Sequence, residues 1–343
     1  MHRVGPLALA PVVLAELRLL GHPEALAEPR GGRVARVELR EDPVQAVVAE
    51  AEVDQGPCAL GDETLPAVGG IDDPADLGDR WRVSADVDLS RIDPGSTEGA
   101  PGGESETEAA LGALNEELLA LQERLWAEGS RSLLVVLQAL DTGGKDGTIR
   151  HVFRGVNPVG VRVTSFKAPS EEERRHDFLW RVHRWVPAAG EIGIFNRSHY
   201  EDVLIVRVHG WVSEAVWRAR YDAINDFEKH LVAAGTTIVK LWLHISPEEQ
   251  AERLRARLED PAKRWKFNVE DLEERKHWHE YMAAAEEMLR RTSTPDAPWY
   301  VVPANRKWYR NWAVNRILTE TLVAMDPRFP EPKDLDHIEI PEV

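Results

Sequence analysis

Residues 141–148, DTGGKDGT, combine the residue types that bind phosphate in many proteins. Glycine lets backbone N–H groups approach an anion closely, the start of a following helix adds positive potential, and a lysine adds a full charge. The pattern approximates G-x-x-x-x-G-K-[ST], although Ala139 replaces the first glycine and Asp146 replaces the hydroxyl residue. We therefore predict a phosphate-binding loop of unusual type. The residues expected to contact phosphate there are Gly143, Gly144, Lys145, Gly147 and Thr148.

Two charged side chains of this loop are candidate catalytic residues. Asp141 places a carboxylate beside the expected phosphates, where it could ligate Mg²⁺, act as a base for the incoming phosphate, or merely form the turn. Lys145 opposes the helix dipole unless an anion is bound, so we expect it to hold a phosphoryl group rather than to be an ordinary surface lysine. Thr148 either replaces the missing hydroxyl or simply lies on the helix.

A second group of polar residues, 196–202, follows another expected strand. In P-loop kinases this strand end usually presents an acid to the metal, but here the position holds Asn196, and Arg197 follows. An arginine at this place directs a fork-shaped donor into a phosphate site, although it could instead form a surface ion pair. Glu201 and Asp202 either complete a metal site or are acids favoured by the start of a helix.

Cations crowd the segment 253–266 of this strongly acidic chain. Arg253 and Arg257 are four residues apart and share one face of an expected helix. In nucleotide kinases a helical lid at this point supplies arginines to the phosphates, whereas most charge runs are solvated faces. We expect Arg253 and Arg257 to be catalytic. Further cations of this lid are Lys263, Arg264 and Lys266.

The segment 303–311, PANRKWYRN, follows the last expected strand and also belongs to the ligand edge. Lys307 and Arg310 either extend a basic track along this edge or are solvated. Trp308 and Trp312 are expected to be packing residues.

The apolar pattern predicts five strands that alternate with helices. The expected strands are 133–140, 159–166, 191–195, 236–245 and 299–302. The expected helices span about 106–129, 145–155, 213–234, 246–258 and 269–291, with another that begins at Ser170 and a last one that ends near 324. Such alternation implies an α/β fold whose parallel sheet is covered by helices on both faces. Ligands are then expected at the C-terminal ends of the strands.

Composition limits the class of protein. The chain has 343 residues, a formal net charge of −17 and a single cysteine, Cys58. The charge argues against non-specific binding of nucleic acid, and the lone cysteine excludes an internal disulfide framework and fits a reducing compartment. No run approaches the roughly 18 apolar residues of a membrane span. Residues 4–15 are apolar, but Pro6 and Pro11 interrupt them, so we favour an accessory segment over a signal peptide.

The chain also changes character along its length. Residues 33–40 alternate like a half-exposed strand, and 45–53 could form a short helix, but neither carries evident chemistry. Residues 71–107 are rich in turn signals and look like an extended arm laid over a domain surface. The expected divisions are an N-terminal extension over 1–70, a catalytic domain over 71–330 and a C-terminal tail over 331–343.

From about 81 to 329 the chain resembles the polyphosphate kinase 2 family, most closely the class III-like members that phosphorylate both AMP and ADP. The matching segments occur in the family's order. They are LQALDTGGKDGTIRHVF, GVNPVGVRVTSFKAPS, FNRSHYEDVL, RLRARLEDPAKRWKFNVEDL and WYVVPANRKWYRNWAV. The resemblance implies a P-loop kinase fold like that of thymidylate kinase, with a helical lid. It also implies Mg²⁺-dependent phosphoryl transfer between inorganic polyphosphate and nucleoside mono- or diphosphates.

The resemblance also assigns roles by motif. Asp141 and Lys145 correspond to the Walker A pair, and Asn196 and Arg197 to the Walker B region. The lid residues are Arg253, Arg257, Lys263 and Lys266. Similar proteins often have glycine at the position of Ala139 and serine at the position of Gly143, so Ala139 is the one residue of the loop that the resemblance does not explain.

Polyphosphate is a polyanion, so its channel must be lined by Lys and Arg even in an acidic protein. We expect Lys145, Arg197, Lys167 and Lys307 to form this channel together with the lid cations. Mg²⁺ would be held by Asp141 with Glu201 or Asp202. An adenine or a guanine nucleotide would approach from the opposite side. Its base is expected near Asp271, Trp278 or Tyr281.

Composition predicts a cytoplasmic protein that binds neither nucleic acid nor membrane, and the family resemblance implies a homo-oligomer, either a dimer or a tetramer. Two alternatives remain open at this point. One is an ATP-dependent nucleoside or nucleotide kinase of the same fold, and the other is a non-catalytic protein that binds polyphosphate or nucleotide.

Overall fold

Within the residues that the computed structural model describes, 77–331 and 340, five strands form one parallel sheet. The strands are β1 (Ser132–Gln138), β2 (Val161–Ser165), β3 (Ile192–Asn196), β4 (Thr236–His244) and β5 (Trp299–Pro303). Their order across the sheet is β2-β3-β1-β4-β5, so β1 lies at the centre and is fully buried. All five strands and the parallel sheet were predicted from the apolar runs, and the α/β fold is confirmed.

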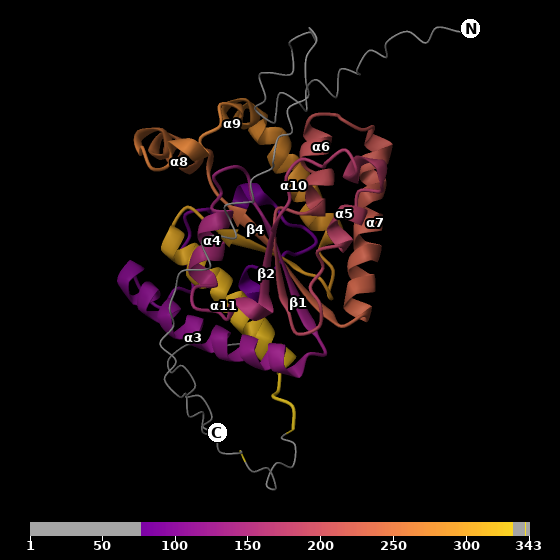
Figure 1. Ribbon diagram of the computed structural model, residues 1–343. Coiled ribbons are helices and arrows are strands. Elements are labelled where there is room, and N and C mark those ends of the chain that lie inside the picture. The colour runs from indigo at the N-terminus through magenta and orange to yellow at the C-terminus, as the bar shows by residue number, and fades with distance from the viewer. Residues whose placement is uncertain (1–76, 332–339, 341–343) are drawn as a thin grey trace, which may run out of the picture. The chain divides into compact units, whose positions relative to one another are not determined.

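Helices cover both faces of the sheet, as Figure 1 shows. One face carries α3 (Glu104–Glu128), α4 (Lys145–Val152) and α11 (Lys307–Met325), with α11 packed against the other two. The other face carries α5 (Trp180–His183), α6 (Ile205–Val208), α7 (Glu214–Ala233) and α10 (Trp278–Thr292). The helices α8 (Pro247–Glu259) and α9 (Glu270–Glu274) lie beyond one end of the sheet. None of these described helices is long and apolar enough to cross a bilayer.

Two of the predicted helices are wrong in extent. The helix expected from Ser170 is only a 3-10 turn, η6 (Glu173–Arg175), although the serine cap itself forms, because Ser170 Oγ accepts from the Glu173 N–H at 3.2 Å. Asp177 then accepts from the N–H groups of Leu179 and Trp180 and starts the separate turn α5. Local side-chain bonds to the backbone therefore divide a segment that has helical composition.

The helix expected over 269–291 is three pieces: α9, a 3-10 turn η9 (Arg275–His277), and α10. Contacts on either side of the break explain it. Arg275 Nη1 donates to Gln250 of α8 at 2.7 Å, whereas Glu274 accepts from Tyr281 Oη at 2.6 Å and approaches His209 Nε2 at 3.0 Å. Tertiary contacts that direct α9 toward α8 outweigh the propensity for one continuous helix.

The predicted arm is present over its described part. It contains the short helices α2 (Leu77–Arg80) and η4 (Leu89–Arg91). Val83 N–H donates to Trp299 O at 2.9 Å, and Val301 N–H donates to Trp81 O, so the arm lies along the edge strand β5. The strand expected at 33–40, the helix at 45–53, the apolar residues 4–15 and Cys58 lie outside the described residues, as does the expected tail except for residues 331 and 340.

A buried charged network fixes the segment that follows β3. Lys240 of β4 donates to Glu228 of α7 at 2.5 Å and to Tyr200 Oη at 2.9 Å, and all three side chains are buried. Lys240 Nζ also donates to the Thr292 carbonyl at the end of α10, at 2.6 Å. Because each charge has a partner, the network tolerates burial and holds the turn η7 (His199–Asp202) against α7, β4 and α10.

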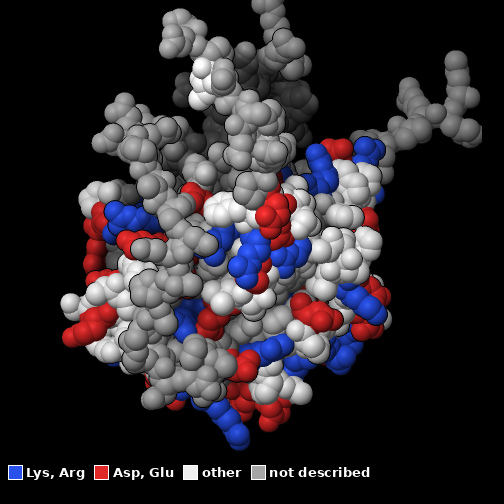
Figure 2. Space-filling model, turned by 90° about the horizontal axis from the view of Figure 1, so that it is seen from below, with Lys and Arg blue, Asp and Glu red and all other residues white. Residues whose placement is uncertain are grey.

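The charged side chains do not form one basic or acidic region on the lower face of the molecule. Figure 2 shows Lys and Arg mixed with Asp and Glu on this face.

Candidate active site

The phosphate loop lies at the edge of the sheet where β1 and β3 end. Leu137 of β1 is in register with Asn196 of β3, and the Arg197 N–H donates to the Leu137 carbonyl at 3.0 Å. Arg197 has a left-handed backbone with a φ of 61°, which is uncommon for a residue with a side chain. Parallel pairing thus brings the segment after β3 next to the loop after β1, as the alternating pattern predicted.

The loop turns tightly into α4. The Gly143 N–H donates to the Leu140 carbonyl at 3.0 Å, and Thr142 and Gly144 both have left-handed backbones, with φ of 63° and 103°. The buried Thr148 hydroxyl donates to the Gly144 carbonyl at 3.1 Å, so it is engaged within its own helix. In this structure the Thr148 side chain therefore lies on α4 and bonds within it.

Lys145 is the buried cation of the loop. The residue is 8% exposed, and its Nζ donates to the carbonyl oxygens of Ala139 at 2.9 Å and Leu140 at 3.4 Å. Burial, together with the charge of Arg197, lowers the pKa of Lys145 to about 8, while the charge of Asp141 opposes this shift. The side chain is therefore mostly protonated at neutral pH, and its carbonyl bonds can be exchanged for bonds to a phosphoryl group.

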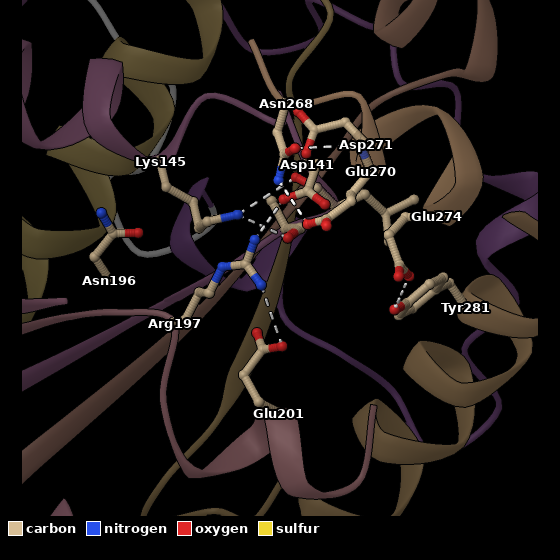
Figure 3. A network of polar contacts seen from close by, with 12 residues as sticks. Asp141, Lys145, Asn196, Arg197, Glu201, Asn268, Glu270, Asp271, Glu274 and Tyr281 are labelled. Atoms are coloured by element: carbon tan, nitrogen blue, oxygen red, sulfur yellow. Dashed lines mark hydrogen bonds and ion pairs between the residues drawn. The ribbon is translucent and has the colours of Figure 1, made fainter. Parts of the chain in front are cut away.

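Arg197 links two carboxylates, as Figure 3 shows. Its Nη2 donates to Asp141 Oδ1, and its Nη1 lies 3.5 Å from Glu201 Oε2. Burial by itself would raise the pKa of the Asp141 carboxyl, but the charges of Arg197 and Lys145 outweigh burial and hold that pKa below its ordinary value. The charge of Glu201 raises the pKa of Arg197. The site therefore holds an ionised Asp141 beside two cations.

The remaining residues predicted after β3 contact other elements. Asn196 Nδ2 donates to Asp146 Oδ1 at 2.8 Å and so connects the end of β3 to the first turn of α4. Asp202 Oδ1 lies 3.0 Å from Arg220 Nη1 of α7, and burial raises the pKa of Asp202 to about 6. The structure thus brings Glu201 to Asp141 through Arg197, but it pairs Asp202 with α7.

Helix α8 supports the loop from the side of β4. Arg253 Nη1 donates to the Thr142 carbonyl at 3.0 Å, and its Nη2 donates to the carbonyl oxygens of Ala304 at 2.5 Å and Asn305 at 3.1 Å. Its Nε donates to Glu249 at 2.6 Å. In this structure Arg253 therefore joins the phosphate loop to the segment after β5 rather than extending from the lid.

Side chains of α9 and α10 lie near Asp141 of the loop. Arg257 Nη1 lies 3.6 Å from Asp271 Oδ2, and burial and the charge of Asp141 raise the pKa of Asp271 to about 6. Tyr281, which donates to Glu274, has a raised pKa because of its burial and this bond. Figure 3 shows Asp271, Glu274 and Tyr281 on the side of Asp141 away from Lys145.

Four predicted lysines lie at the periphery. Lys167 and Lys307 are exposed, and neither side chain forms an ion pair or hydrogen bond with the described residues. Lys263 pairs with Asp260 at 2.6 Å, and Lys266 Nζ lies 5.0 Å from the centre of the exposed Trp265 ring. The structure does not bring these four cations into contact with the loop.

One residue near the loop was missed in the sequence, and the burial of another was not foreseen. Gln250 Nε2 donates to the Asp141 carbonyl at 3.0 Å, and it lies three residues before Arg253 on the same helical face, which is the signal that could have found it. Arg310 was expected to be solvated or part of a basic track, but it is buried at 2% exposure against α4. No group of three or more His, Cys, Asp or Glu arranged to hold a metal occurs among the described residues.

Comparison with known proteins identifies the family. The family model for polyphosphate kinase 2 matches residues 103–330. The chain belongs to the polyphosphate kinase 2 family. The predicted family, the P-loop kinase-like fold and the enzyme class, a phosphotransferase, are thereby confirmed.

Relatives within this polyphosphate kinase 2 family are similar over most of the domain. An AMP/ADP-polyphosphate phosphotransferase of Meiothermus ruber is 54% identical over 256 residues, which are 74% of this chain and 96% of that protein. An ADP-polyphosphate phosphotransferase of Rhodopseudomonas palustris is 48% identical over 63% of this chain and 79% of its own length. The crystal structure of polyphosphate kinase 2 from Arthrobacter aurescens TC1 is 47% identical, with a TM-score of 0.74, and the match covers 80% of this chain and 96% of that one.

The structure also explains Ala139 in this member of the polyphosphate kinase 2 family. A Cβ atom added to Gly143 would collide with the Cβ of Ala139, and it would lie 2.8 Å from the Leu140 carbonyl oxygen. The methyl group of Ala139 therefore occupies the space that a side chain at position 143 needs. Ala139 and the Leu140 carbonyl therefore both favour glycine at 143.

We predict that Gly143→Ser alone lowers kcat/KM for phosphoryl transfer at least about tenfold, because the collision displaces the loop backbone. The double variant Ala139→Gly/Gly143→Ser should recover much of this loss, since it removes the methyl group, although the approach to the Leu140 carbonyl remains. Steady-state kinetics of the two single variants and the double variant measure the coupling. If Gly143→Ser is equally active with either residue at 139, the two positions are independent and the explanation is wrong.

Proposed function

We propose that the enzyme catalyses Mg²⁺-dependent phosphoryl transfer between inorganic polyphosphate and adenine nucleotides, converting AMP to ADP and ADP to ATP. The observation that carries this proposal is the arrangement of Lys145, Asp141 and Arg197 around the phosphate loop. The name of the Meiothermus ruber relative, which acts on both AMP and ADP, supports the pair of acceptors.

The chain's own residues would act mainly by positioning and by neutralising charge. Transfer requires a terminal phosphate oxygen of the nucleotide to form a bond to the end phosphorus of polyphosphate, while the bond to the next bridging oxygen breaks and leaves a polyphosphate one unit shorter. Lys145 and the N–H groups at the start of α4 hold the transferring group. Arg197 is held at the loop by Asp141 and Glu201, so its remaining N–H groups can stabilise the charge that spreads over the phosphate oxygens.

The residues present fit a magnesium site that is completed by substrate. Mg²⁺ usually binds one or two carboxylates, substrate phosphates and water, and does not need a cluster of protein ligands. Asp141 is an ionised, half-buried carboxylate beside the loop, and Glu201 lies on the other side of Arg197. Asp141, with Glu201, would hold the ion. When bound, it would neutralise phosphate charge and align the two substrates.

We assign the two substrates to different sides of the loop. The part of the polyphosphate chain that extends beyond the loop would be attracted by the exposed Lys167 and Lys307 and by Lys263 and Lys266 of the lid. The acceptor nucleotide would lie under α9 and α10, with its base near Asp271, Trp278 or Tyr281. Guanine is a further candidate base.

We also infer the cellular setting from composition and family. A single cysteine fits the reducing cytoplasm, where nucleotides and polyphosphate are available. The acidic chain is expected not to bind nucleic acid, and family resemblance suggests a homo-oligomer. Light scattering of the purified protein measures the oligomeric state.

The direct test is formation of ATP or ADP from polyphosphate. Wild-type protein with Mg²⁺ should form ATP from ADP and ADP from AMP when polyphosphate is the only phosphoryl donor. Lys145→Ala should lower the rate about 10²–10³-fold because a donor to the transferring group is lost. Lys229→Ala, which removes an exposed cation from α7, is the matched control and should leave the rate unchanged. Transfer from ATP to a nucleoside without polyphosphate, and none from polyphosphate, would instead indicate an ATP-dependent kinase.

Removal of the metal gives a second test. Chelation by EDTA should stop transfer, and added Mg²⁺ should restore it. Asp141→Asn should raise the Mg²⁺ concentration needed for half-maximal rate by roughly 10–100-fold, because the ionised ligand is lost. Asp222→Asn, at an exposed position on α7, controls for the change in net charge. An unchanged Mg²⁺ requirement in Asp141→Asn would exclude Asp141 as the metal ligand.

A further inference from the structure

Arg310 is a buried cation whose described hydrogen-bonding partner is neutral. It lies in the first turns of α11 and is 2% exposed. Its Nε and Nη2 donate to Asn311 Oδ1 at 3.2 and 2.7 Å, and no carboxylate among the described residues forms an ion pair with it. A buried guanidinium that lacks an anionic partner is unfavourable. The carboxylate of Glu249 acts on the charge of Arg310, but Glu249 is already the ion-pair partner of Arg253.

The guanidinium of Arg310 lies against the start of α4. A Cβ atom added to Gly144 would overlap Nη1 and lie 3.1 Å from Cζ of Arg310, and one added to Gly147 would lie 3.3 Å from its Nη2. Two glycines of the loop thus leave the space that this side chain fills. The glycine at 144 is required both by its left-handed backbone and by Arg310.

A second guanidinium, that of Arg253, lies beside the first. Arg253 Nη1 would be 3.5 Å from the same added Cβ of Gly144, and Arg253 already uses the nearby Glu249 as its ion-pair partner. Burial and the charge of Arg253 lower the pKa of Arg310 to about 9, which leaves it protonated at neutral pH. These two adjacent cations have one carboxylate between them, so the surroundings of Gly144 carry an excess of positive charge.

We propose that Arg310 is a positioning residue for phosphoryl transfer, which supports the loop at Gly144 and whose charge is balanced by the phosphoryl groups that the loop holds. The proposal rests on the proposed placement of phosphate at this loop. Arg310 acts through the loop backbone and adds to the positive potential at the start of α4, where the N–H groups already favour an anion. Phosphate binding in turn reduces the repulsion between Arg310 and Arg253.

Asn311→Asp tests the charge without removing the side chain. A carboxylate at 311 can still accept both hydrogen bonds from Arg310, and its negative charge balances the charge of the guanidinium. The ligand-free variant should therefore melt at the same or a higher temperature than wild type. The KM for polyphosphate should rise about tenfold, which corresponds to about 1.4 kcal/mol, because Arg310 no longer adds to the positive potential at the start of α4. KM values for ADP and AMP measured in the same assays tell whether polyphosphate or nucleotide phosphates depend on Arg310. An unchanged KM for all three substrates would overturn the proposal.

Two substitutions of Arg310 itself complete the experiment. Arg310→Met should raise the KM for polyphosphate and reduce the increase in melting temperature that polyphosphate causes, whereas Arg310→Lys, which keeps the charge, should recover part of both. Arg316→Gln removes a cation that pairs with Glu320 further along α11 and is the control. Arg310 is only a packing residue if both variants destabilise the ligand-free protein equally and polyphosphate raises their melting temperatures as much as that of wild type. Because wild type and Lys145→Ala are assayed in parallel, failure of the proposed function is seen separately, as absence of transfer in wild type.

Discussion

The ion pair between Asp141 and Arg197 is the interaction on which the site depends. It joins the loop after β1 to the segment after β3. It also holds the side chain of Arg197, a residue with a left-handed backbone, at the proposed phosphate site. The fold provides for this pair in two ways. Register between β1 and β3 aligns the two strand ends, and the buried network around Lys240 holds the turn that follows Arg197.

Charge balance explains most of the other contacts near the loop. Lys145, Arg197, Arg253 and Arg310 converge on it in a chain whose formal net charge is −17. Carboxylates or carbonyl oxygens partner three of these cations, and each such bond can be kept or exchanged when phosphate binds. A loop built this way is stable as a protein segment and also favours polyanions, because the excess positive charge is local. The negative net charge of the whole chain is therefore compatible with binding polyphosphate at the loop.

The sequence predicted the layers of the fold and the residues at its centre, because both follow local rules. Apolar runs located all five strands, and DTGGKDGT and FNRS identified Asp141, Lys145 and Arg197. The partners of Asp202 and Arg253 could not be predicted, since a charge in a helical segment does not say which distant element it meets. The burial of Arg310 could not be predicted for the same reason. Its burial depends on the space left by Gly144 and Gly147, and on how α11 packs against α4.

If Asp141 and Arg197 act as one unit in binding and transferring phosphate, the effects of substituting them should not be additive. A double-mutant cycle with Asp141→Asn and Arg197→Gln tests it most directly, with kcat/KM for ATP formation from ADP and polyphosphate as the measurement at saturating Mg²⁺. We predict strong non-additivity. The kcat/KM of the double variant should be at least about tenfold higher than the value expected if the two single losses multiply, which is a coupling of about 1.4 kcal/mol. Losses that simply multiply would contradict it and would mean that the two side chains act independently.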